Sequence, residues 1–556
     1  MASLREDTTR VVLEADKGNA TVVMDVVDYD RKVLEIIEKH PFKQLTRDPT
    51  RKNERRVNEG LKRLAKNGCI SKEMLARLRL PEGSSCAPLL YGRVKLHKEG
   101  HPLRPIVSSV GSSAHEIGKE IARVLAPYSR NVASYIKNTQ DLVDKVRSWN
   151  MQEDEVLVSF DVKSLFTSVP VDEAMKAVNK RLVEDVDLRE RTGLNPETVM
   201  DMLNLCLQNR QFQFRETHYE LVDGLAMGSP VSPPVANIFM ADFEVEALES
   251  FQGESPREWF RYVDDVIAVV KRLLIQKFLD HLNNRHGNIQ FTVEVEKEGS
   301  LPMMDVLLHH EEDGKVSVSI YRKPTHTERY LPFSSHHPLS MKKSVRSSLL
   351  RRVDYVSEDS EKEVNHVMSV LKENGYPDVC LRSWRNRKKL AAKDEAERPK
   401  LSVCLPYVRG LSESIRRILR PLSIGVFFKP QSWKWTVMKG VKDERKSHEK
   451  AGVVYEMRYK TREKTYIGET ARSAYIRGKE HQSQARNGHP ELSAVAEHAW
   501  TGHEIEWAPR VIANCKNNRE RKVKEAWLIY DREKKGKMTM NRDRGVGLNK
   551  LWVDLV

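Results

Sequence analysis

The chain has 556 residues, more than one hydrophobic core usually supports, so we expect about two to four domains. Hydrophobic residues make up 39% and charged residues 31% of the sequence, which suits a globular protein with a heavily charged surface. The net charge of +15 favours a polyanionic partner, with nucleic acid ahead of a membrane surface; charge that serves only solubility is the alternative.

Cysteine usage and the N-terminus bear on the cellular compartment. The six cysteines, at positions 69, 86, 206, 380, 404 and 515, form no Cys-x-x-Cys pair and predict neither a disulfide framework nor a cysteine zinc site. Residues 1–7 lack the apolar core of a signal peptide, and no apolar run is long enough to span a bilayer. We therefore expect a soluble intracellular protein in a reducing compartment.

The N-terminal segment predicts two short strands at 11–30, charged helices at 28–80 and a basic hairpin at 90–107. Lys95 and Arg104 fall on opposite arms of this hairpin. Cations held on a hairpin can cover the phosphates of an incoming nucleotide. A basic surface hairpin without a ligand is the alternative.

A short apolar strand at 156–167 contains Asp161 and follows predicted helices at 112–150. Asp at the end of a buried strand can hold a metal ion when other carboxylates lie near it. A place at the N-terminus of the next helix is the alternative, because Asp is favoured there. Downstream, a helix at 195–210 and a hairpin lead to a loop at 224–234, where glycine permits close approach of a template.

The segment 260–270 places the acidic pair Asp264 and Asp265 between two apolar flanks. A β-hairpin with the pair at its tight turn explains this pattern. Taken alone, the pair could also be two aspartates of a solvated turn that bind no ligand. Neighbouring carboxylates repel unless a cation lies between them, and Mg²⁺ binds such oxygens while keeping positions for substrate phosphates. With Asp161, the pair would form a three-carboxylate site able to hold two metal ions.

Strands predicted at 291–296, 301–308 and 316–324 complete an α+β domain with helices behind the carboxylate-bearing strands. From about 335 to 425 the chain predicts basic helices that suit a grip on duplex backbone, with a solvated charged face as the alternative. The cations of this segment are Lys342, Lys343, Arg346, Arg351, Arg352, Arg385, Arg387, Lys388 and Lys389. Residues 386–400 are interpreted as a flexible insertion.

The C-terminal part predicts a hairpin that carries Tyr455 and Tyr466, then a helix with Arg477 and His481 four residues apart on one face. A later helix carries Glu525. Tyrosine to handle water, arginine for a phosphate and glutamate for a metal would form a single-metal phosphodiesterase site. A small α/β domain with surface Arg and His is the alternative.

Seven blocks in order carry a family resemblance that covers almost the whole chain. The chain resembles a Penelope-like retroelement polyprotein, a reverse transcriptase followed by a GIY-YIG endonuclease. The blocks are Asp-Lys-Gly-Asn-Ala-Thr-Val-Val-Met at 16–24, Lys-Leu-His-Lys with Leu-Arg-Pro-Ile at 95–106, Phe-Asp-Val-Lys-Ser-Leu-Phe-Thr at 160–167, Met-Gly-Ser-Pro at 227–230, Tyr-Val-Asp-Asp at 262–265, Leu-Pro-Met-Met-Asp-Val at 301–306 and Tyr-Arg-Lys-Pro-Thr-His-Thr at 321–327.

The resemblance implies an α+β fold: a right-hand polymerase with fingers, palm and helical thumb, plus a small α/β nuclease. Residues 1–334 would be the fingers and palm, 335–428 a thumb-like region, 429–450 a linker and 451–550 the nuclease. The reaction would be RNA-templated DNA synthesis from a DNA 3′ end, after the nuclease cuts one target strand. The implied partners are an RNA template, a DNA target and primer, and deoxynucleoside triphosphates.

The resemblance also implies roles for single residues. Two Mg²⁺ ions would bind in the polymerase and one in the nuclease. In the polymerase, the metal ligands would be Asp161, Asp264 and Asp265, and the triphosphate would be bound by Lys95 and Arg104. Phe166 would exclude a ribose 2′-OH, and Gly228 would lie by the nucleotide and template. Residues 321–326 would lie near the primer. In the nuclease, Tyr455, Tyr466, Arg477, His481 and Glu525 would be catalytic, Glu525 would hold the metal, and Asn541 matches a late Asn of the family.

Two departures from the family and two rival readings remain. Family zinc sites use a Cys pair where this chain has Tyr459 and Arg462, so His498 and His503 alone predict no zinc. The first block lies close to Met1, which predicts that the family's N-terminal extension is absent. Chromosomal integration implies work in the nucleus. Two other functions are possible for the chain. One is a repurposed, non-catalytic nucleic-acid-binding copy; the other is an organellar-intron type of polymerase, against which the Tyr/Arg/His set of the C-terminal part argues.

Overall fold

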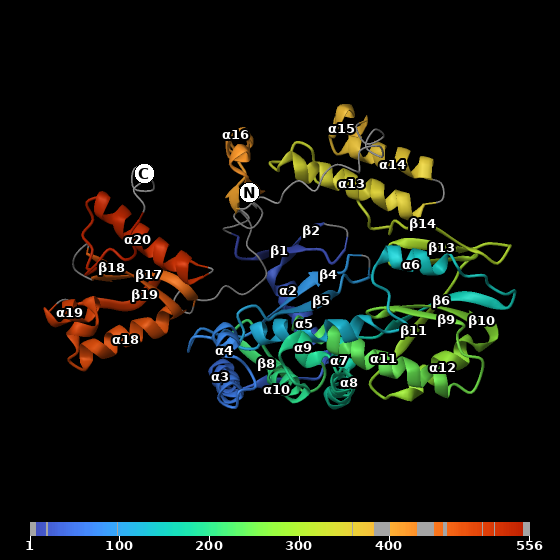
Figure 1. The fold of residues 1–556 in the computed structure, drawn as a ribbon, viewed down its shortest axis with the longest axis horizontal. Coiled ribbons are helices and arrows are strands. Elements are labelled where there is room, and N and C mark those ends of the chain that lie inside the picture. Colours follow the sequence, from blue (N-terminus) through green and yellow to red (C-terminus); the bar gives the residue numbers. More distant parts are fainter. Residues whose placement is uncertain are drawn as a thin grey trace.

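The fold has a large N-terminal body and a separate C-terminal body, with a small unit between them in sequence (Figure 1). The computed structural model describes residues 7–17, 20–96, 98–357, 360–382, 401–430, 450–459, 464–502, 504–515 and 517–548. The backbone N–H of Ser473 in the C-terminal body donates to the carbonyl of Gly83 in the N-terminal body, at 3.3 Å. No helix within these ranges is both long and apolar enough to cross a membrane.

The first strands form a hairpin and part of a five-stranded sheet. β1 (Arg10–Glu14) and β2 (Thr21–Asp25) pair antiparallel, as predicted. The sheet has the order β3 (Phe42–Leu45), β8 (Thr217–Leu221), β7 (Gln211–Phe214), β4 (Leu89–Val94) and β5 (Leu103–Ser108), and β4–β5 is the predicted basic hairpin. β3 lies in a segment predicted to be helical. That part of the prediction is wrong, because Phe42 packs edge-on against Phe212 while β3 pairs with β8.

A four-stranded antiparallel sheet lies at the centre of the N-terminal body. Its order is β11 (Phe291–Val295), β6 (Glu155–Val162), β10 (Asp265–Lys271) and β9 (Glu258–Tyr262). Because side chains alternate along a strand, Val158 and Phe160 enter the core shared with helices, and Leu157 enters the core on the opposite face. Burial on both faces explains why β6 and β10 are nearly continuous apolar runs.

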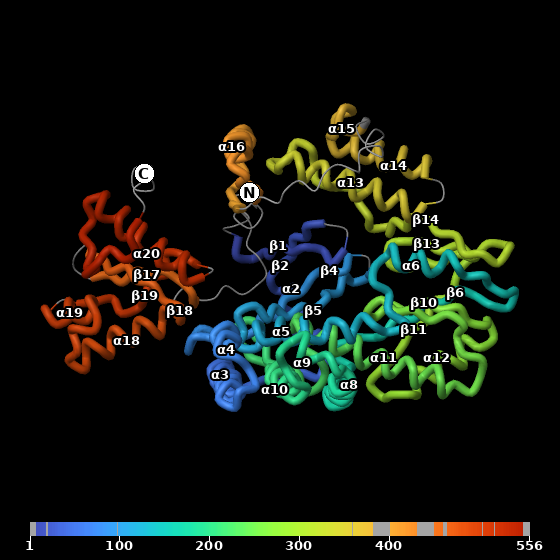
Figure 2. The backbone as a smooth tube through the Cα atoms, viewed as in Figure 1, coloured from blue at the N-terminus to red at the C-terminus, as the bar shows by residue number. Residues whose placement is uncertain are grey.

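Helices cover one face of this sheet and extend around the five-stranded sheet (Figure 2). Their apolar positions form the largest core, which includes Ile121, Val178, Met202 and Phe239. The helices before the segment at 335 are α2 (Val26–Lys39), α3 (Thr50–Lys66), α4 (Lys72–Leu78), α5 (His115–Arg130), α6 (Thr139–Val146), α7 (Leu165–Ser168), α8 (Val171–Glu184), α9 (Leu188–Thr192), α10 (Pro196–Leu207), α11 (Ser232–Ser250), η1 (Arg272–Leu274) and α12 (Ile275–Arg285). Of these, α2 packs in a separate core with the five-stranded sheet, and α6 packs on the opposite face of the central sheet.

A three-stranded sheet covers the other face of the central sheet. It contains β12 (Ser300–Met303), β13 (Val306–His310) and β14 (Val316–Ile320). The single strand predicted at 301–308 is wrong, because Met303 pairs with Val306 and Met304 turns the chain with φ +55°. The result is a tight hairpin that places Asp305 at its tip.

The segment at 335–425 is less uniformly helical and less basic at its surface than predicted. α13 (Leu339–Val356), α14 (Ser360–Glu373) and α15 (Asp378–Arg382) form their own core, but β15 (Leu401–Pro406), α16 (Leu411–Leu419), η3 (Arg420–Leu422) and β16 (Ile424–Lys429) form a small βαβ unit. Lys342 and Arg346 are buried and donate to backbone carbonyls, so they present no charge to a duplex. Arg385, Arg387, Lys388, Lys389, the insertion at 386–400 and most of the linker at 429–450 lie outside the described residues.

The C-terminal body is a three-stranded antiparallel sheet with helices on both faces. The order is β18 (Thr465–Ser473), β17 (Ala451–Tyr459) and β19 (Ile505–Asn514), and β17–β18 is the predicted hairpin. Tyr455 and Met457 enter one core, while Val454 and Ile467 enter the other, which α20 covers. The helices are α18 (Ala474–Arg486), η5 (Pro490–Leu492), α19 (Ala494–Trp500) and α20 (Asn518–Lys534).

Candidate active sites

The acidic pair lies at the turn of the β9–β10 hairpin, as predicted. Tyr262 pairs with Asp265, so Val263 and Asp264 are the two loop residues. Val263 has φ +60°, which is uncommon for a β-branched residue. The buried Arg261 guanidinium donates to the Val263 carbonyl at 3.1 Å and holds this turn in place.

Asp161 lies directly across from Asp265 in the pairing of β6 with β10. The backbone N–H of Val162 also donates to the Asp264 carbonyl at 3.2 Å. Three carboxylates therefore meet at one edge of the central sheet. Asp161 belongs to the strand, and the residue that precedes α7 is Ser164, so the alternative role at a helix N-terminus does not hold.

Burial and neighbouring negative charge raise the pKa of two of the three carboxyl groups. The protein walls displace water from Asp265 and raise its pKa to about 6, with further contributions from the charges of Asp264 and Asp161. Burial also raises the pKa of Asp161, and the charge of Asp264 adds to it. This concentration of negative charge favours bound cations.

A cavity of about 810 Å³ opens over these carboxylates; we call it the aspartate cavity. Four predicted nucleotide-binding residues line it together with the three aspartates. Burial lowers the pKa of Lys95, and the neighbouring charge of Arg104 lowers it further. Arg104 also pairs with Asp16 at 3.1 Å. The predicted residues in the lining are Lys95, Arg104, Phe166, Gly228, Asp161, Asp264 and Asp265.

Gly228 is required by packing. It has φ +82°, and a Cβ at this position would overlap the carbonyl oxygen of Val107 on β5. The Ser109 hydroxyl also donates to the Gly228 carbonyl at 2.8 Å. The loop thus closes against the basic hairpin and forms one wall of the aspartate cavity.

Sequence reasoning missed two cations in this lining, Lys17 and Lys98. The Asp16 N–H donates to the Val94 carbonyl at 2.8 Å, which brings the end of β1 beside the basic hairpin. Lys17 lies in a block used only for the family resemblance. The available signal was a lysine in the turn between two predicted strands.

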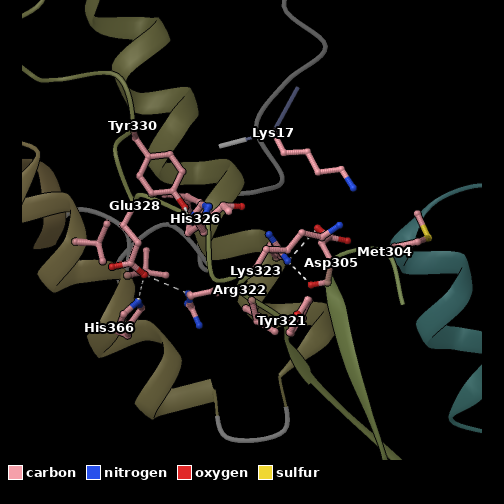
Figure 3. Close-up of a pocket in the computed structure, with 16 residues that line it drawn as sticks. Lys17, Met304, Asp305, Tyr321, Arg322, Lys323, His326, Glu328, Tyr330 and His366 are labelled. Carbon is pink, nitrogen blue, oxygen red and sulfur yellow. Dashed lines mark hydrogen bonds and ion pairs between the residues drawn. The ribbon is translucent and has the colours of Figure 1, made fainter. Parts of the chain in front are cut away.

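Lys17 also lines a second cavity of about 400 Å³, between the three-stranded sheet and α13 and α14 (Figure 3). Lys17 reaches toward Lys323 and Asp305 across this cavity (Figure 3). Burial lowers the pKa of Lys323, and the charge of Lys17 lowers it further. Much of the 321–326 segment, predicted to lie near the primer, lines this cavity, which adjoins the aspartate cavity through Lys17.

The three aspartates can supply some of the ligands of a bound cation, and substrate phosphates and water would have to supply the rest. In the described part of the chain, no group of three or more His, Cys, Asp and Glu side chains forms a ready metal cluster. Mg²⁺ in phosphoryl-transfer sites usually has one or two carboxylate ligands and takes the rest from substrate phosphates and water. The raised pKa values of Asp265 and Asp161 and the open cavity above them fit that kind of binding.

The C-terminal body brings together all five residues predicted for its site; we call this the tyrosine site. Tyr455 and His481 are hydrogen bonded at 2.8 Å, and the rings of Tyr466 and His481 lie 5.5 Å apart. Burial raises the pKa of Tyr455 well above its usual value, and the charge of Arg477 opposes this. Glu525 on α20 accepts the backbone N–H of Glu469 at 3.0 Å. Burial raises the Glu525 pKa to about 7, and the charge of Glu469 adds to it.

The tyrosine site has an inner and an outer part. Tyr455 and His481 are buried, whereas Tyr466, Arg477 and Glu525 are half-buried. Asn541 has a structural contact: its side chain accepts from the Ile467 N–H at 3.1 Å and donates to the Ile467 carbonyl at 2.6 Å. His498 packs against Tyr459 at 5.9 Å, and Arg462 and His503 lie outside the described residues.

Comparison with known families identifies the class of the N-terminal body. Residues 96–301 match the reverse transcriptase (RNA-dependent DNA polymerase) family, and residues 329–386 match the animal helix-turn-helix domain. The chain therefore contains a reverse transcriptase domain, and Asp161, Asp264 and Asp265 lie within it. Neither match reaches the C-terminal body.

Solved structures resemble the fold at low identity. Telomerase from Candida albicans, in complex with a fragment of telomeric RNA, is 10% identical with a TM-score of 0.44, over 67% of this chain and 62% of that chain. The RNA-dependent RNA polymerase of a human picobirnavirus is 13% identical with a TM-score of 0.41, over 67% and 82%. The chain thus spans about three fifths of the telomerase. Comparison with curated protein sequences finds no match.

Proposed function

We propose that this chain is an RNA-directed DNA polymerase of a Penelope-like retroelement and that its C-terminal body is a GIY-YIG endonuclease. The nuclease would nick a target DNA strand in the nucleus, and the polymerase would extend the freed 3′ hydroxyl on an RNA template. One observation carries the polymerase role: three aspartates and the cations of a separate sheet line a single cavity. Seven predicted residues from five segments of the chain converge there.

The proposed polymerase chemistry divides among the cavity walls. Asp161, Asp264 and Asp265 would hold Mg²⁺, which stabilises charge on the reacting phosphoryl group and favours ionisation of the 3′ hydroxyl. Lys95 and Arg104 would bind the triphosphate through charge-assisted hydrogen bonds. Phe166 would block a ribose 2′-OH by contact.

The proposed nuclease chemistry rests on the half-buried residues of the tyrosine site. Glu525 would hold one Mg²⁺ ion, which supplies charge stabilisation at the scissile phosphate. Arg477 would bind the phosphate, and an ionised tyrosine oxygen would accept a proton from the attacking water. The observation that favours this role is the convergence of Tyr466, Arg477 and Glu525 from a strand and two helices.

Primer extension on an RNA template tests the polymerase. Purified protein with Mg²⁺ should extend a DNA primer, and Asp264→Asn should abolish extension while template binding persists. Unchanged incorporation by this variant would refute the metal assignment. Wild-type protein that binds RNA and DNA but extends no primer would support the alternative, a non-catalytic nucleic-acid-binding copy.

Target-primed synthesis tests the coupling of the two activities. Supercoiled DNA, an RNA template and deoxynucleoside triphosphates should give nicked DNA with attached complementary DNA. Glu525→Gln should prevent this product on intact DNA and allow it on DNA nicked beforehand. Failure on both substrates would show that Glu525 is needed for more than nicking.

A further inference from the structure

A chain of buried hydrogen bonds leads from helix α19 into the tyrosine site. The Ser493 hydroxyl lies 2.6 Å from Nδ1 of His481, and Nε2 of His481 lies 2.8 Å from the Tyr455 hydroxyl. All three side chains are at most 5% exposed. Ser493 has no part in the nuclease roles proposed above.

The partners of Ser493 fix the direction of the first hydrogen bond. Its oxygen accepts the backbone N–H of Ala496 at 3.2 Å, as the N-cap of α19. Among the described residues, Nδ1 of His481 is the one acceptor within reach of its hydroxyl proton. If Nδ1 carried the ring proton, the Ser493 proton would be buried without a partner, which is unfavourable because a buried donor cannot bond to water instead. The satisfied arrangement therefore has Ser493 donating to Nδ1.

The hydrogen bond at Nδ1 also determines which proton the other ring nitrogen of His481 carries. Burial and the neighbouring Arg477 charge lower the pKa of His481 to about 3, so the ring is neutral near pH 7 and carries one proton. With Nδ1 accepting, that proton is on Nε2 and is donated to the Tyr455 oxygen. The Tyr455 proton is left to Tyr466, whose ring centroid lies 6.2 Å from that of Tyr455; burial raises the pKa of Tyr466, and hydrogen bonding from Tyr455 opposes this.

We infer that Ser493 is a positioning residue of the tyrosine site: it fixes the Nε2–H tautomer of His481 and so turns the Tyr455 proton toward Tyr466. This role rests on the proposed nuclease function. Tyr466 is half-buried and faces the outer part of the site, so a donated hydrogen bond there stabilises its ionised form. Tyr466, rather than the buried Tyr455, is then the tyrosine whose ionised oxygen accepts a proton from water.

The competing explanation is that Ser493 serves only as the cap of α19. Loss of an N-cap would destabilise the C-terminal body without changing the imidazole. Asn517 gives a matched control, because it caps α20 by accepting the Glu520 N–H at 2.9 Å. Within the described residues, the structure gives Asn517 no hydrogen bond to His481, Tyr455 or Tyr466.

The test uses full-length protein with ¹⁵N-labelled histidine. Long-range ¹H–¹⁵N spectra report which ring nitrogen carries the proton, and the His481→Gln spectrum assigns the signal. We expect protonated Nε2 in the wild type. Ser493→Ala should bring Nδ1–H into the population and lower the nicking rate about tenfold or more, with DNA binding unchanged. Ser493→Thr, which keeps the hydroxyl, should restore both.

The outcomes separate the positioning role from the nuclease function. A protonated Nδ1 in the wild type would overturn the inference, and so would a Ser493→Ala protein whose tautomer is unchanged and whose nicking matches Asn517→Ala. If the wild type has the Nε2–H tautomer, Ser493→Ala changes it and no variant nicks DNA, the positioning role holds and the nuclease proposal fails.

Discussion

The two candidate sites of this chain are built in opposite ways. The aspartate cavity is open, and like charges converge in it from neighbouring strands, with separate cations on the facing hairpin. The tyrosine site is compact, and its inner residues satisfy one another through a buried network. An open site of like charges is completed by its ligands, whereas a closed network is complete before any ligand arrives.

The two sites also differ in which residues bear the free-energy cost of burying charge. In the aspartate cavity, burial and mutual repulsion raise the pKa of Asp265 to about 6. In the tyrosine site, burial disfavours the charged form of inner and outer residues alike: it raises the pKa of Glu525 to about 7 and lowers the pKa of His481 to about 3. Substitution of a carboxylate should therefore separate activity from stability at both sites, by different amounts.

The largest effect is expected from Asp264→Asn. Loss of one carboxylate from the open set should lower primer extension by at least about 10²–10³-fold, because charge stabilisation at the reacting phosphoryl group is weakened. The midpoint of thermal unfolding should stay equal or rise, since one source of repulsion is gone. Primer-extension rates and calorimetry measure the two quantities. Asp280→Asn, on the exposed surface of α12, is the control and should change neither.

Glu525→Gln should lower nicking by about 10²-fold and leave primer extension unchanged. The amide oxygen of glutamine can still accept the Glu469 N–H, so the fold around β18 is kept. Nicking of supercoiled DNA and a filter-binding assay measure cleavage and binding. Glu533→Gln on the same helix removes a carboxylate that pairs with Arg544 at 2.8 Å and should cleave normally. Equal loss in both variants would contradict a specific role for Glu525.

Gly228→Ala should break the wall of the aspartate cavity. The new Cβ would overlap the Val107 carbonyl, so the loop at 227–230 must move away from the basic hairpin. We expect a loss of more than about 2 kcal/mol in the free energy of unfolding and a primer-extension rate about tenfold lower. Gly68→Ala is the matched control, because Gly68 also has positive φ, +73°, with nothing within 4 Å of a Cβ. Equal destabilisation would show that backbone conformation, and not the contact, explains Gly228.

The structure brings together the residues that the sequence singled out at both sites, but the contacts that hold them there were not predicted. Asp161 and the acidic pair were singled out because they lie at the ends of continuous apolar runs, which predict buried strands. The need for Gly228 arises from contact with Val107, a residue about 120 positions earlier, which no local pattern reports. Ser493 was missed for the same reason: its partner His481 becomes a neighbour only after α18 and α19 pack together.

Tertiary contacts also explain the errors in secondary structure. β3 forms because its neighbour β8 supplies a pairing edge, and the tight turn at Met304 divides a continuous apolar run into two strands. The prediction of a basic surface at 335–425 was partly wrong because a run of cationic residues does not reveal which side chains face solvent and which face the core. Lys342 and Arg346 turn inward to backbone carbonyls, whereas Lys343 remains exposed.

The smallest expected effect is on the pH dependence of stability, to which Glu525 in the outer part of the tyrosine site and His481 in its inner part contribute with opposite sign. The pKa of Glu525 rises from 4.5 to about 7 on folding, so between these values the folded state holds more protons than the unfolded state. The stability of the C-terminal body should therefore fall as pH rises through this window and level off above about 7. His481 contributes the opposite slope, because its pKa falls to about 3. Only the difference between variants isolates either residue.

Hydrogen exchange of C-terminal peptides in full-length protein, with a metal chelator, measures this stability from pH 5 to 8. Glu525→Gln should protect these peptides more than the wild type does at pH 8 and about equally at pH 5. Glu533→Gln should follow the wild type at every pH. Added Mg²⁺ should stabilise the wild type at pH 8 more than it stabilises the Glu525→Gln variant, because the ion binds the carboxylate that folding otherwise disfavours. A constant difference between wild type and Glu525→Gln across the pH range would contradict the raised pKa and place Glu525 in the same closed network as Tyr455.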